Sequence, residues 1–149
     1  MKKIGFYKIF DEKGNAMVFV VIIFFVIMIL SGSMAFLFNN NLKQTKHQQD
    51  SLEAYYLAYS GGMIAYEALL ANNSAKLNEI INNNSTLTVS SLPMGRGTVS
   101  VVAEISTDEK FEGWVKITST AVLDRNSLTN VRNLYFDPTN PLEMLWSSN

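Results

Sequence analysis

Residues 16–38, AMVFVVIIFFVIMILSGSMAFLF, decide how this chain is organised. The stretch contains 23 residues without a charge or a proline. As an α-helix rising about 1.5 Å per residue it would reach roughly 34 Å, and the hydrocarbon core of a bilayer is about 30 Å thick. The stretch therefore predicts a membrane-spanning helix near the amino terminus, with the rest of the chain carried behind it.

Length and composition leave room for this anchor and one small domain. About 110 of the 149 residues follow Phe38, and single domains commonly have about 100 to 150 residues. The chain has no cysteine, which excludes a disulfide scaffold, a structural thiolate zinc site and a lipid anchor on an acylated cysteine. The domain is therefore expected to be stabilised by packing alone.

Charge is distributed unevenly along the chain. Residues 1–14, MKKIGFYKIFDEKG, carry four lysines and two acids, which leaves 8 basic and 11 acidic residues beyond them, a net charge of −3. Only Lys43 and Lys46 follow the apolar run closely, so the positive-inside rule places the amino terminus in the cytoplasm and the domain outside, extracellular or periplasmic. Because the exported part is acidic, no direct binding of nucleic acid is expected.

The basic leader ends in Lys13-Gly14, and the uninterrupted apolar run follows it. This junction resembles the prepilin signal of type IV pilins and the related pseudopilins. The resemblance implies that a membrane prepilin peptidase cuts between Gly14 and Asn15 and that the new terminus, Asn15, is N-methylated. It also implies that the apolar helix is kept as the core of a surface filament, with other pilins or pseudopilins as partners. Secretory signals, in contrast, are cut on the far side of the apolar run.

Two features depart from the pattern of major pilins. Those proteins usually carry a glutamate at the fifth mature residue, where this chain has Phe19, and the first proline of this chain comes only at Pro93. In the family, that carboxylate is thought to pair with the terminal amine of a neighbouring subunit inside the apolar core, where an unpaired charge is costly. Minor pilins at the filament tip and K-type pseudopilins similarly lack the acid, so the resemblance points to a minor, tip or initiating subunit.

Other interpretations of the leader stay open. Ser31-Gly32-Ser33 and Ser33-Met34-Ala35 both resemble cleavage sites of an ordinary signal peptide. An uncut signal anchor that carries an extracellular binding or sensor module would also fit the orientation. Within the resemblance itself, the machine served could be a pilus, a type II secretion system or a competence system for DNA uptake.

Beyond a polar stalk at residues 39–50, the sequence again has a helical period. Apolar side chains recur at spacings of four and three and predict one helix face that packs on the domain: Leu52, Tyr56, Tyr59, Met63, Tyr66 and Leu70. Gly61 and Gly62 cost about 1 kcal/mol each relative to alanine, which favours a close approach to a neighbouring element or a bend. Residues 15–71 are therefore predicted to form one helical spine that ends near Asn72.

Residues 72–149 form the predicted globular head. A short helix is expected from an N-cap at Ser74 to Ile81, followed by a loop at residues 82–84. The period then changes to two, which predicts strands at 87–90, 99–105, 115–123 and 130–136, with a turn at 93–97. Met144, Leu145 and Trp146 are expected to dock on the head at an unspecified place. The predicted fold is α+β, a long N-terminal helix packed against a small antiparallel sheet.

The sequence offers little that suggests chemistry. His47, the only histidine, lies in the polar stalk and is expected to be solvated. Asp108, Glu109 and Glu112 could offer oxygen ligands to calcium, but the twelve-residue loop with its glycine is missing, and a plain turn is the favoured interpretation. No catalytic, cofactor or metal site is predicted, and an enzyme is not expected.

Overall fold

The computed structural model describes residues 12–71 and 75–148, with only the backbone described for 12–15 and 148. It has the predicted α+β fold. Helix α1 (Glu12–Ala71) and helix α2 (Ala75–Asn83) precede five strands, and a 3₁₀ turn, η1 (Glu109–Phe111), lies between the second and third of them. The strands are β1 (Leu87–Met94), β2 (Gly97–Ile105), β3 (Val115–Leu123), β4 (Thr129–Phe136) and β5 (Met144–Ser148). The chain divides into two compact units, residues 1–46 and 47–149, and α1 contributes to both.

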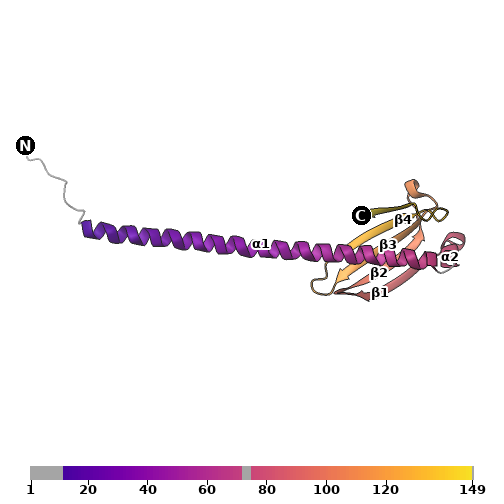
Figure 1. Cartoon of the computed structure of the whole chain (residues 1–149), viewed down its shortest axis with the longest axis horizontal. Helices are drawn as coiled ribbons and strands as arrows, with labels where there is room; N and C mark the ends of the chain where they lie inside the picture. The colour runs from indigo at the N-terminus through magenta and orange to yellow at the C-terminus, as the bar shows by residue number, and fades with distance from the viewer. Residues whose placement is uncertain (1–11, 72–74, 149) are drawn as a thin grey trace, which may run out of the picture. The chain divides into compact units, whose positions relative to one another are not determined.

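The head contains one antiparallel meander in which each strand pairs with the next, in the order β1-β2-β3-β4-β5. Burial alternates along β2 and β3, so every second side chain faces the hydrophobic core. Completely buried core side chains include Val99, Val115, Ile117, Leu134 and Phe136. Figure 1 shows the strands lying along the carboxyl-terminal part of α1, with α2 next to the end of that helix.

Helix α1 is continuous because nothing in its sequence interrupts it. The first proline of the chain is Pro93, far beyond the end of the helix at Ala71. In the apolar section, the hydroxyl of Ser33 donates a hydrogen bond of 2.9 Å to the carbonyl of Ile29, so this polar side chain is satisfied within the helix. The helix is described as far as Ala71, and the predicted helix end at Asn72 and the predicted N-cap Ser74 lie outside the described residues.

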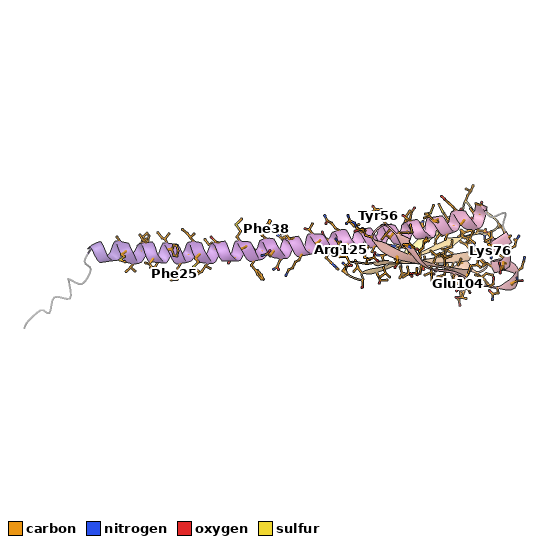
Figure 2. The ribbon with its side chains drawn as sticks, turned by 90° about the horizontal axis from the view of Figure 1, so that it is seen from below. Phe25, Phe38, Tyr56, Lys76, Glu104 and Arg125 are labelled. Atoms are coloured by element: carbon orange, nitrogen blue, oxygen red, sulfur yellow. The ribbon has the colours of Figure 1, made fainter. Side chains whose placement is uncertain are left out.

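The face of α1 that packs on the sheet differs from the predicted one. Tyr66 is buried as expected, but Leu52 and Tyr56 are 57% and 62% exposed, and Tyr56 points away from the sheet in Figure 2. The buried face is instead lined mainly by small residues, Ala54, Ala58, Gly61 and Gly62, with Leu69 at its end. Small residues bury little apolar area themselves, but they allow the helix backbone to approach the sheet closely, which hydrophobic periodicity alone does not reveal.

Gly61 and Gly62 mark the closest approach of α1 to the sheet, one of the two alternatives predicted for them. A Cβ atom at Gly61 would collide with Val99 and lie 2.8 Å from the Oγ of Ser119, and one at Gly62 would lie 2.8 Å from the ring of Trp146. Real Cβ atoms essentially never come this close to a neighbour. Only glycine therefore fits at both positions without movement of the side chains that face it.

Three boundaries in the head were predicted wrongly. Pro93 and Met94 belong to β1, and the turn consists of Gly95, with φ 59°, and Arg96. Proline is tolerated there because β1 is an edge strand, where a missing N–H costs no ladder bond on the open side. Helix α2 continues through Asn82 and Asn83, because Asn84 takes the left-handed conformation with φ 49° and the hydroxyl of Ser85 donates to the carbonyl of Glu79.

The tail forms a strand that the sequence did not predict. Met144, Leu145 and Trp146 lie in β5, which pairs with β4 so that Trp146 is opposite Leu134. The expected docking of these residues on the head is therefore confirmed, and its place is the second edge of the sheet. Asp137 stabilises the connection from β4: its carboxylate accepts hydrogen bonds from the hydroxyl and the backbone N–H of Thr139, and these bonds lower the pKa of the carboxyl.

Candidate functional site: an exposed apolar helix and a pinned head

The amino-terminal section of α1 presents an apolar surface that nothing in the described chain covers. From Met17 to Phe38 its large hydrophobic side chains are exposed by 43% at Ile23 to 75% at Met34. Phe25 and Phe38 both project outward from the helix in Figure 2. The best window of the helix has a mean hydropathy of 2.8, so α1 is long and apolar enough to cross a membrane. A surface of this kind marks contact with lipid or with another protein.

The predicted processing site lies at the start of this helix. The backbones of Gly14 and Asn15 lie in the first turn of α1, whereas the side chain of Asn15 and residues 1–11 lie outside what the structure describes. Phe19 is 64% exposed, and its neighbours Val18 and Val20 are exposed to a similar extent. The position where major pilins usually carry a carboxylate is thus part of a purely apolar surface.

A polar cluster that the sequence did not indicate ties α1 to the turn between β3 and β4. The carboxylate of Asp50 is only 5% exposed, forms an ion pair with Arg125 and accepts a hydrogen bond of 2.7 Å from the amide of Asn126. Because a buried carboxylate is costly without such partners, the cluster fixes where the helix enters the head. The sequence did contain one indication that Asp50 is buried: its spacing of four residues places it on the same helix face as Ala54 and Ala58.

Aromatic rings form a second connection between α1 and the sheet. The guanidinium of Arg132 on β4 lies 4.3 Å from the ring centre of Tyr55. Tyr55 stacks on Tyr59 at 6.4 Å, and Tyr59 stacks on Trp146 of β5 at 4.4 Å. Farther along the helix, Tyr66 packs edge-on against Phe136. Tyr55, Tyr59 and Tyr66 therefore pack α1 against the sheet.

The residues considered for chemistry are spread apart or act as turn residues. Asp108 accepts a hydrogen bond of 3.1 Å from the backbone N–H of Lys110 and so caps η1. Glu109 and Glu112 are exposed beside it, and His47 is exposed on α1. Among the described residues, no group of three histidine, cysteine or acidic side chains could hold a metal ion. The turn that the sequence favoured here is present as η1, capped by Asp108.

Comparison with protein-family models, with curated proteins and with solved structures finds no match to this chain. Its function must therefore be inferred from its own residues.

Proposed function

We propose that this chain is a minor pilin or pseudopilin, a structural subunit of a type IV pilus-like filament. In this proposal a prepilin peptidase removes residues 1–14, Asn15 becomes the N-methylated terminus, and residues 16–38 remain in the membrane until assembly. The head is then carried on the outer side and exposed on the filament surface. The partners are other pilins or pseudopilins, which contact this chain through the apolar helix.

The observation that carries the proposal is the combination of two surfaces on one helix. The first section of α1 is apolar all round and exposed, and the last section forms part of the core of the head. An ordinary anchor does not need to contribute to the core of its domain. Here the buried glycines 61 and 62 and the Asp50 cluster hold the helix against the sheet. A helix whose last section is built into the core of the head is expected in a subunit that joins a filament through the first section of the same helix.

Assembly by this route is physically reasonable because the apolar section has no charge to desolvate. Lipid tails and the side chains of neighbouring helices are equally apolar, so the section can exchange one environment for the other without exposing its surface to water. The exchange leaves the backbone hydrogen bonds intact, since all of them lie within the helix.

Phe19 supports a minor rather than a bulk subunit. A terminal amine brought next to this residue in a dry core would find no carboxylate and would remain an unpaired charge. Repeated incorporation of this chain would incur that cost at every step. A single subunit at the tip has no subunit ahead of it and avoids the cost.

Amino-terminal sequencing and mass spectrometry of the purified protein test the proposal. We expect the mature chain to begin at Asn15 with a methylated amine, and Gly14→Val to leave the leader attached. Gly5→Val is the matched control, because it changes a leader glycine away from the junction and should be processed normally. An intact Met1 in the unaltered protein, or a start near Met34 or Phe36, would rule the proposal out.

A second candidate is a single-pass signal anchor that carries a binding or sensor module. It is favoured because this chain has Phe19 where major pilins usually carry a glutamate. It predicts an uncut leader and an unchanged mass in cells that lack prepilin peptidase. The pilin proposal predicts a heavier, unprocessed protein in the same cells.

A further inference from the structure

Residues 39–46 of α1, which directly follow the apolar run, carry two lysines and no acid. Lys43 and Lys46 lie in the sequence NNNLKQTK of residues 39–46, and the first acidic residue beyond the run is Asp50. Both lysines are exposed, and they are three residues apart on one side of the helix. Neither takes part in any of the ion pairs found in the described part of the chain.

These lysines lie at the depth of lipid headgroups when residues 16–38 span the bilayer. At about 1.5 Å per residue, Lys43 follows Phe38 by about 7.5 Å and Lys46 follows it by about 12 Å. The headgroup layer extends about 5 to 7 Å beyond the hydrocarbon core on each side. Side chains on a helix lean toward its amino terminus, which here is toward the membrane, and a lysine can extend by about 6 Å, so both ammonium groups reach the layer.

We propose that Lys43 and Lys46 bind the phosphates of anionic phospholipids in the leaflet on the head side while the chain is stored in the membrane. This inference rests on the membrane-embedded stage of the proposed function and is independent of leader removal. The attraction is between opposite charges, because the segment offers two cations and no competing carboxylate, and each basic residue near an anionic surface contributes about a five-fold preference at low salt.

The test uses the full chain in vesicles of phosphatidylcholine mixed with phosphatidylglycerol. Because the chain has no cysteine, a single Phe38→Cys substitution allows a fluorophore to be attached at the head-side end of the apolar run. Quenching by brominated phosphatidylglycerol, compared with brominated phosphatidylcholine, gives the relative affinity of the two lipids at that position. The charge variant is Lys43→Gln with Lys46→Gln, and the matched control removes two exposed head lysines, Lys76→Gln with Lys110→Gln.

We expect a several-fold preference for the anionic lipid, up to about 25-fold at low salt. It should fall close to one in the Lys43/Lys46 variant and stay unchanged in the Lys76/Lys110 control. An equal preference in the two variants, or none in the unaltered chain, would overturn the inference.

Two further results would assign the lysines to a different partner and would also overturn it. One is loss of the preference when inorganic phosphate replaces chloride at equal ionic strength, which would indicate general phosphate binding. The other is a preference that disappears as protein is diluted in lipid, which would indicate pairing with acids on a second copy. Failure of processing at Gly14 would leave the lipid measurement unaffected, so the two proposals fail separately.

Discussion

Replacing Gly61 by alanine is expected to destabilise the head, although alanine is the better helix former. The new Cβ would collide with Val99 and lie 2.8 Å from the Oγ of Ser119. Both neighbours are completely buried, so neither side chain can turn into solvent to make room. Overpacking a core costs about 1–3 kcal/mol, against about 1 kcal/mol gained in helix propensity. We expect a net loss of about 1 kcal/mol in the free energy of unfolding, which lowers the Tm by about 4–8 °C for a unit of about 100 residues.

Thermal unfolding of the full chain in detergent, followed by near-ultraviolet circular dichroism, measures this change because both tryptophans lie in the head. Gly32→Ala is the matched control, since a Cβ there meets nothing within 4 Å, and it should leave the Tm of the head unchanged. Gly62→Ala should cost less than Gly61→Ala, because its neighbour is the edge of the half-buried Trp146 ring on the edge strand β5. A higher Tm for Gly61→Ala would refute the close approach of helix and sheet.

Three further predictions concern the connections within the head, each measured as the free energy of unfolding of the full chain. Arg125→Ala should cost about 3 kcal/mol, because it leaves the carboxylate of Asp50 buried without its cation. Asp50→Ala should cost less, because the Arg125 side chain that it leaves unpaired is 45% exposed and can be hydrated. Equal costs for the two variants would contradict this prediction. Trp146→Ala should cost about 2 kcal/mol, because it removes a half-buried ring together with its stack on Tyr59. Hydrogen exchange should then increase first in β5, and unchanged exchange would contradict this prediction. The hydrogen bonds to Asp137 lower the pKa of its carboxyl from 3.8, so the stability that they contribute is present above about pH 4 and is lost as the pH falls below that value. Between about pH 5 and pH 2, the free energy of unfolding should therefore fall less in Asp137→Asn than in the unaltered chain.

The sequence predicted the elements of this fold better than the contacts between them. The first half of α1 follows from its uninterrupted apolar run, and β2 and β3 follow from a period of two. Each of these patterns lies within one stretch of sequence. Strand β5 has five residues after a seven-residue connection, and it forms because β4 offers a free edge, which no local pattern expresses. A strand of that kind can be predicted only when its partner is already placed.

The wrong helix face has a related physical cause. Large apolar residues such as Leu52 and Tyr56 carry the strongest periodic signal, but the sheet packs where side chains are small, at Ala58 and Gly61. Asp50 was missed because a charge argues against burial unless its partner is known, and that partner, Arg125, is 75 residues away in the sequence. Interactions that depend on long-range pairing were thus the ones that sequence analysis could not supply.

Gly32 and Gly61 lie in the same helix, but only Gly61 is packed against another element of the described chain. Each sits inside the same helix at a cost of about 1 kcal/mol relative to alanine. At Gly61 the structure shows the compensation, a sheet that packs where a Cβ would stand. At Gly32 nothing in the described chain comes within 4 Å of the same position, so its cost is not compensated within one copy. In an apolar helix, small residues allow a second helix to approach closely, which is the contact that the proposed filament predicts at Gly32.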